Sequence, residues 1–209
     1  RAVLHDREVT YSFVGSEKFL GKSIGESYRR LSEGLAAGLR RLGAAAEIEP
    51  PGGNRYTSHP SCFATSSLCE LSIRGRKVVG SAQCREGGAV LQHGSVLLRS
   101  PGGRFASFLR PRGAGGNGVI LPPDHAAGLC EALGREVTFA EAAAAIRAGM
   151  AEALSLDFRE APLRPDERAA AANLVRARYG NDGWTFSRQR PGARFALLDT
   201  LRCDDLSFS

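Results

Sequence analysis

The stretch LCELSIRGRKVVGSAQCREGGAVLQHGSVLL, residues 68–98, decides the fold of this chain. It predicts three strands over residues 68–73, 77–83 and 89–98, which are runs rich in apolar residues separated at residues 74–76 and 86–88. The segments between the strands are short and contain glycine, as hairpin turns do. Consecutive strands that are joined by hairpins run antiparallel, so the sequence predicts an antiparallel meander.

Helical and further strand patterns flank the meander. Ser23 and Glu26 form a capping box at the start of residues 23–43, where apolar positions recur every three or four residues. Strands are also expected at residues 2–4, 9–14 and 46–49, and helices at residues 124–133, 139–154 and 166–179. The predicted class is therefore α+β, with helices packed on a mostly antiparallel sheet.

Length and composition limit the class of protein. With 209 residues, 43% of them apolar and 24% charged, the chain is expected to form one soluble globular domain. No apolar run approaches the roughly 18 residues that a membrane span requires, and the first residues do not resemble a secretory signal. We therefore predict a cytoplasmic protein without a membrane partner.

Metal, dinucleotide and nucleic-acid sites are not predicted. The five cysteines lack Cys-x-x-Cys spacing, and the four histidines show no metal-ligand spacing. Residues 113–118 have the glycine spacing of a dinucleotide fingerprint, but no strand enters the segment and no helix begins in it, so we interpret it as a loop. The net charge of +6 suits an acidic partner, yet the arginines are scattered, which argues against nucleic acid.

Three side chains are candidates for chemistry. Cys62 follows a loop rich in proline and glycine and could reach a substrate, although most lone cysteines are small buried hydrophobic residues. Lys77 is one of three lysines among the 28 basic residues, and its ammonium could stabilise a thiolate and an oxyanion; a solvated strand-edge lysine is the alternative. His93 is expected to share a strand face with Ser95, as a ligand contact or as a hydrogen-bonded histidine.

The strand pattern also assigns faces to the meander. Because side chains alternate along a strand, Lys77 is expected to share a face with Val79 and Ser81. Gly80 and Gly94 lie inside predicted strands, where glycine usually marks the close approach of a ligand or of another backbone.

An ordered set of motifs resembles the catalytic domain of the biotin and lipoate protein ligase family: Cys62-Phe63, Glu70-Leu71, GRKVVGSAQ at 75–83 and LQHGS at 91–95. Residues 1–12 are similar to the strand pair that follows the double-arginine and Thr-Gly-Gly motif of that family. We therefore expect a fragment of a longer chain that lacks this N-terminal part. The resemblance extends over residues 1–184, and residues 185–209 are expected to form a C-terminal tail.

The resemblance implies acyl transfer. A cysteine fifteen residues before the lysine (77 minus 62) is similar to the octanoyltransferase branch whose nucleophile lies in the loop before the lysine strand. Such enzymes move an octanoyl group from acyl carrier protein, through a cysteine thioester, to a lysine of a lipoyl domain or of the glycine cleavage H protein. No ATP, metal or bound cofactor is needed. Cys62 would be the nucleophile, and Lys77 would activate it and hold the carbonyl oxygen.

The resemblance also implies a substrate-binding set, namely Arg1, Ala2, Val3, His5, Gly80, Ser81, Ala82, His93 and Gly94. Two other functions remain open from the sequence. An ATP-dependent lipoate-protein ligase would form an acyl-adenylate without using Cys62. A non-catalytic relative would bind acylated carriers or pair with a missing subunit.

Overall fold

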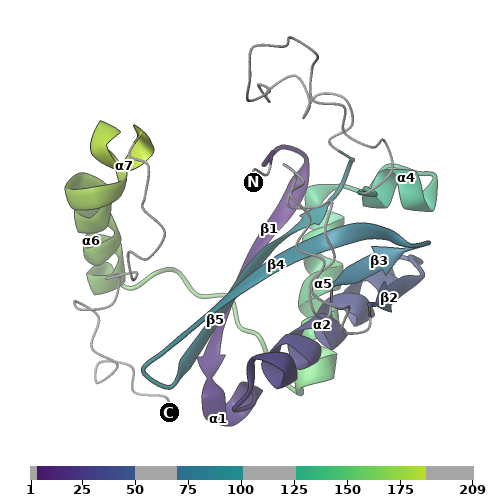
Figure 1. Cartoon of the computed structure of the whole chain (residues 1–209), viewed down its shortest axis with the longest axis horizontal. Helices are drawn as coiled ribbons and strands as arrows, with labels where there is room; N and C mark the ends of the chain where they lie inside the picture. The colour runs from purple at the N-terminus through teal and green to yellow at the C-terminus, as the bar shows by residue number, and fades with distance from the viewer. Residues whose placement is uncertain (1–3, 50–69, 101–125, 187–209) are drawn as a thin grey trace, which may run out of the picture. The chain divides into compact units, whose positions relative to one another are not determined.

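The computed structural model describes three ranges of the chain, residues 4–49, 70–100 and 126–186. The chain divides into two compact units, Arg1–Phe158 and Arg159–Ser209. The sheet and the two longest helices belong to the first unit, and shorter helices make up the described part of the second (Figure 1). Within the described ranges, no helix is both long enough and apolar enough to cross a membrane.

A five-stranded sheet is the centre of the first unit, with the strand order β1-β5-β4-β3-β2. Its strands are β1 (Glu8–Ser16), β2 (Ala46–Ile48), β3 (Leu71–Ile73), β4 (Arg76–Glu86) and β5 (Ala89–Leu97). Every neighbouring pair is antiparallel, which confirms the predicted meander and fold class. The strand expected at residues 9–14 is β1. Of the strand expected at residues 2–4, only residue 4 lies in the described ranges, and it is not in a strand.

Two long helices, α2 (Ile24–Arg41) and α5 (Phe139–Leu154), lie side by side and cover one face of the sheet (Figure 1). Both agree with the sequence prediction. The core between the layers includes Val79, Val90 and Val96 from the strands, all nearly inaccessible to solvent.

The sheet therefore has two faces of different composition. The helix face is identified by Gln83, whose side chain accepts a hydrogen bond from Ser27 of α2 at 2.9 Å. Since successive side chains of a strand point to opposite faces, Ser81 and Arg85 share the helix face with Gln83. We call the opposite side, which carries Gly80, the second face.

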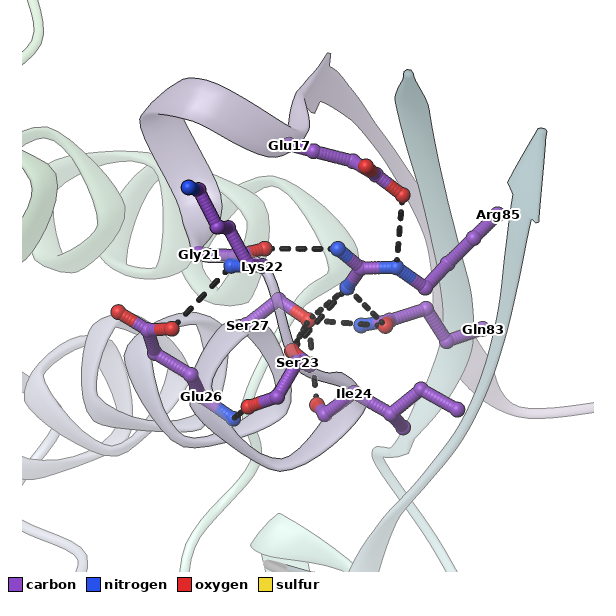
Figure 2. A network of polar contacts seen from close by, with 9 residues as sticks. All are labelled: Glu17, Gly21, Lys22, Ser23, Ile24, Glu26, Ser27, Gln83 and Arg85. Carbon is purple, nitrogen blue, oxygen red and sulfur yellow. Dashed lines mark hydrogen bonds and ion pairs between the residues drawn. The ribbon is translucent and has the colours of Figure 1, made fainter. Parts of the chain in front are cut away.

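Arg85 ties the helices to the end of the β4–β5 hairpin (Figure 2). Its guanidinium forms an ion pair with Glu17 of the short helix α1 (Glu17–Leu20) at 3.0 Å. It also donates to the carbonyl oxygen of Gly21 at 2.7 Å, to that of Ser23 at 3.1 Å and to the hydroxyl of Ser27 at 2.9 Å. One strand side chain thus fixes the connection into α2.

The helix predicted at residues 124–133 is shorter in the structure. Residues 124–125 lie outside the described ranges, and Ala126 forms a parallel bridge with Lys77 instead of a helical turn. Helix α4 (Leu129–Leu133) begins only after Gly128, its N-terminal cap. At Ala126, pairing with the sheet takes the place of the predicted helix.

The second unit contains α6 (Pro165–Leu174), a π-helical turn η2 (Val175–Tyr179) and α7 (Asp182–Phe186). The first two elements together match the helix predicted at residues 166–179. The boundary expected between a domain ending at residue 184 and a tail remains a prediction.

Helices α2 and α5 cross at glycines. A β-carbon on Gly38 would lie 2.7 Å from the Cα atom of Ile146, and one on Gly149 would overlap the backbone of Gly38. Because backbone atoms cannot rotate away, the helices require glycine at this crossing.

We therefore expect Gly149→Ala to lower the free energy of unfolding by about 2–3 kcal/mol through overpacking. Gly25→Ala, in the partly exposed first turn of α2, is the matched control and should be neutral or stabilising by about 0.5–1 kcal/mol, from helix propensity. Urea denaturation measures both. Equal effects of the two substitutions would contradict the assigned crossing.

Candidate functional site

Lys77 is buried and lies on the second face. It pairs with Ser72 of β3, whereas the next pair along the two strands is Leu71 with Val79. The register shift leaves one extra residue, Val78, in β4. A bulge of this kind interrupts the alternation of side chains. The expectation that Lys77 shares a face with Val79 and Ser81 is therefore wrong.

Glu70 holds the Lys77 ammonium. The Nζ atom of Lys77 lies 2.5 Å from Oε1 of Glu70, and the two side chains are 9% and 3% exposed. The second carboxylate oxygen of Glu70, Oε2, is buried and has no hydrogen-bond partner among the described residues. A buried ion pair fixes both groups, because each charge depends on the other once water has been removed.

The backbone around Lys77 is also fixed. Its carbonyl oxygen accepts a hydrogen bond from the Ala127 amide at 2.9 Å. The neighbouring Arg76 side chain donates to the carbonyl oxygen of Ala126 at 2.7 Å. The segment that replaces the start of the predicted helix therefore fixes the beginning of β4.

A second buried carboxylate, that of Glu8, lies at the start of β1. Its Oε1 atom accepts hydrogen bonds from the hydroxyls of Thr10 at 2.7 Å and Ser95 at 2.8 Å, and lies 2.7 Å from Nδ1 of His5. Burial raises the pKa of Glu8, but the hydrogen bonds from His5, Thr10 and Ser95 outweigh it and bring the pKa below its ordinary value. Glu8 is therefore ionised at neutral pH.

The register places these groups on one face. Thr10 of β1 pairs with Ser95 of β5, and Ser95 pairs with Gly80 of β4. Paired residues in adjacent strands point to the same side of a sheet. Since Gly80 lies on the second face, Thr10 and Ser95 lie there as well, together with Lys77.

Ala82 and His93, two predicted substrate contacts, extend the same face. They pair with each other two positions beyond Gly80 and Ser95 along the hairpin, and both are exposed. His93 shares its face with Ser95, as the alternation predicted. The structure thus brings His5, Gly80, Ala82 and His93 to the side of the sheet that carries Lys77.

Ser81 and Gly94, two further predicted substrate contacts, pair with each other on the helix face of the sheet. The Ser81 hydroxyl shares a hydrogen bond of 2.7 Å with the phenol of Tyr11, whose pKa is raised by burial. A β-carbon on Gly94 would lie 2.9 Å from the Tyr11 ring and would overlap the carbonyl oxygen of Gly80. Close packing of the protein itself therefore explains the glycine at position 94, and the Ser81 side chain does not reach the face of Lys77.

Four of the predicted site residues, Cys62, Arg1, Ala2 and Val3, lie outside the described ranges, and their roles remain predictions. Two other cysteines are described. Cys84 is exposed, whereas Cys130 is buried and its sulfur accepts a hydrogen bond from the Val137 amide at 3.3 Å. Among the described residues, no cluster of three or more His, Cys, Asp or Glu side chains could hold a metal ion.

Glu8 and Glu70 were not predicted as site residues from the sequence. Glu70 was visible only as part of a motif, and Glu8 only as a charged residue next to a predicted strand. The available signal is an acidic residue at the edge of a strand, since Glu8 is the first residue of β1 and Glu70 immediately precedes β3. Burial of such a residue implies a partner, but the partner itself becomes known only from the strand register.

Comparison with known proteins gives consistent results. Residues 1–151 match the family model described as the lipoyl protein ligase A/B catalytic domain. Octanoyltransferase LipM of Symbiobacterium thermophilum is 39% identical over 90% of this chain and 71% of its own length. Octanoyltransferase LipM of Kyrpidia tusciae is 40% identical over 90% of this chain and 72% of its own length.

A solved structure shows the same fold. The bi-partite lipoate protein ligase of Thermoplasma acidophilum, described with its E2 lipoyl domain, superposes with a TM-score of 0.63 at 21% identity. The match covers 88% of this chain and 66% of that protein, so the chain spans about two thirds of the solved structure. At this identity, the match supports the fold alone.

Removing one partner of the buried ion pair should destabilise the protein. We expect Glu70→Gln to lower the free energy of unfolding by about 3 kcal/mol, because the buried Lys77 ammonium loses its carboxylate. Adding Lys77→Met should recover part of the loss, because no charge then remains buried. Glu33→Gln, in the exposed pair with Arg29, should cost less than about 1 kcal/mol. A loss for Glu70→Gln as small as this control would contradict a buried pair.

The lowered pKa of Glu8 predicts a pH dependence of stability. A carboxylate whose pKa is lowered in the folded protein stabilises it above the unfolded value, near 4.5, and this contribution disappears as the pH falls through the lower native pKa. The stability difference between wild type and Glu8→Gln should therefore shrink on acidification, as followed by urea denaturation at successive pH values. Glu47→Gln, in an exposed position of β2, is the control. A difference that grows towards acid pH would contradict the assignment.

Proposed function

The chain belongs to the lipoyl protein ligase A/B catalytic domain family, and we propose that it is a protein octanoyltransferase working through a thioester on Cys62. The observation that carries this proposal is the likeness to octanoyltransferases over nine tenths of the chain. The buried ammonium of Lys77, held by the Glu70 carboxylate, supports it, because a fixed cation near a thiol favours the nucleophilic thiolate.

In the first half of the reaction, the thiolate of Cys62 attacks the carbonyl carbon of an octanoyl thioester on acyl carrier protein. A new carbon–sulfur bond forms to Cys62, the bond to the carrier sulfur breaks, and the carrier leaves as a thiolate that takes up a proton. Lys77 stabilises the attacking thiolate and then the carbonyl oxygen as it gains negative charge. Glu70 keeps the ammonium in place, so little reorganisation is required when charge develops.

In the second half, the amine of an acceptor lysine attacks the thioester on Cys62. The amide bond forms, the carbon–sulfur bond breaks, the nitrogen gives up a proton, and Cys62 leaves as the thiolate that began the cycle. The energy of the thioester drives both steps, so we propose no ATP, metal or bound cofactor. The acceptor is a lipoyl domain or the glycine cleavage H protein, and we place the enzyme with these carriers in the cytoplasm. The net charge of +6 suits acidic carriers.

The test is capture of the acyl-enzyme. The full-length protein should gain one octanoyl group from octanoyl acyl carrier protein, seen by intact mass spectrometry, and hydroxylamine should remove it. Cys62→Ser should form no adduct, whereas Cys84→Ser, which removes an exposed thiol, should form it normally. Lys77→Ala should slow its formation by about 100-fold or more, because the fixed positive charge is lost.

Two outcomes would overturn the proposal. An adduct that persists in Cys62→Ser would place the acyl group elsewhere. Release of pyrophosphate from ATP with lipoate or octanoate, at the same rate in wild type and Cys62→Ser, would instead identify an ATP-dependent ligase.

A further inference from the structure

We propose that His5, oriented by the buried carboxylate of Glu8, is the general base that takes the proton from the incoming lysine amine in the second half of the reaction. This inference rests on the proposed octanoyl transfer. It assigns a catalytic role to a pair of side chains that the thioester chemistry of Cys62 and Lys77 does not use.

The contacts of Glu8 determine which nitrogen of His5 carries the proton. A carboxylate only accepts hydrogen bonds, so the Nδ1 atom of His5, 2.7 Å from Oε1 of Glu8, must be the donor. In the neutral imidazole, the lone pair is then on Nε2, at the other edge of the ring. The His5 side chain is 65% exposed and that of Glu8 is 3% exposed. The base therefore faces solvent and the group that orients it is buried.

The burial of Glu8 calls for an explanation beyond stability. Removing a carboxylate from water is costly, and here one oxygen, Oε2, is buried without a hydrogen-bond partner among the described residues. The other oxygen, Oε1, accepts hydrogen bonds from Thr10, Ser95 and His5. Three donors on one oxygen keep Glu8 ionised and hold it against the His5 ring. A fixed carboxylate behind an imidazole selects its tautomer and stabilises the imidazolium that forms on proton transfer.

His5 and Glu8 lie close enough to Lys77 for His5 and Lys77 to act on the same carbonyl group. Ser95, which contacts Glu8, pairs with Gly80 of the adjacent strand, about 5 Å away in a sheet. Lys77 lies three residues before Gly80 on β4, about 10 Å along the strand. Both side chains are long enough to converge on a substrate bound over the second face. Lys77 can then hold the oxygen while His5 meets the attacking amine.

The chemistry of the second half requires a base. A lysine side chain has an ordinary pKa of about 10.4, so the acceptor arrives mostly as an ammonium and must lose a proton to become a nucleophile. Lys77 is itself an ammonium in an ion pair, and the sulfur of Cys62 is occupied by the acyl group. The ammonium first gives one proton to water. Nε2 of His5 then takes the second proton from the amine nitrogen as the nitrogen–carbon bond forms and the carbon–sulfur bond breaks. The imidazolium then returns its proton to the Cys62 thiolate or to water.

Measuring the two half-reactions separately distinguishes a general base in the transfer step from a residue needed for both steps. In the full-length protein, acylation is followed by intact mass, and the isolated acyl-enzyme is then mixed with a purified lipoyl domain in a rapid-quench instrument. His5→Ala should still acylate, but its transfer rate should fall by about 100-fold or more. Added imidazole should restore part of the transfer rate and leave the rate of acylation unchanged. Glu8→Gln should reduce transfer less, because the imidazole remains, and Glu33→Gln on α2 should have no effect.

The outcomes that contradict the role of His5 differ from those that contradict the proposed function. Unchanged transfer in His5→Ala, or an equal loss of both half-reactions without imidazole rescue, would overturn the role of His5. His5 is exposed, so its substitution leaves the fold intact and the inference testable even if Glu8→Gln unfolds. Failure of the wild-type protein to form any acyl-enzyme would instead refute the proposed function itself.

Discussion

The extra residue in β4 is the feature on which the arrangement of the site depends. Helices α2 and α5 cover one face of the sheet, and regular alternation backwards from Gln83 would direct Lys77 towards them. The register shift between β3 and β4 pairs Lys77 with Ser72 instead. The ammonium therefore lies on the face opposite the helices, in contact with Glu70, and the core keeps its apolar side chains.

Two buried carboxylates then give the second face its electrostatic character. The charge of Glu70 is compensated by Lys77, and that of Glu8 by three donors on one oxygen. Each has a second oxygen that is buried and lacks a partner among the described residues. Such groups cost folding energy, but they provide fixed charges that need not reorganise as a reaction proceeds. The close packing of helices α2 and α5 at their glycines, together with the contacts of Arg85, offsets part of this cost.

Much of the fold, but less of the site, followed from the sequence. The meander, α2 and α5 were predicted because their periodicity and caps are local signals. The face on which Lys77 lies was not predicted, because a bulge depends on how two strands pair and has no clear signal in the sequence of either strand. The start of α4 was wrong for a similar reason, since Ala126 pairs with Lys77 from a distant part of the chain. Glycine at position 94 was interpreted as room for a ligand, whereas the ring of Tyr11 occupies that space.

The central claim is that the acyl group passes through Cys62 beside the ammonium of Lys77. The most direct measurement follows isotope-labelled octanoyl groups from acyl carrier protein through a single turnover, with peptide mapping of the full-length protein at each time. We expect the label to appear first on the peptide that contains Cys62 and then on the acceptor lysine, at matching rates. Label that reaches the acceptor without passing through Cys62, or that accumulates on Cys84, would contradict it.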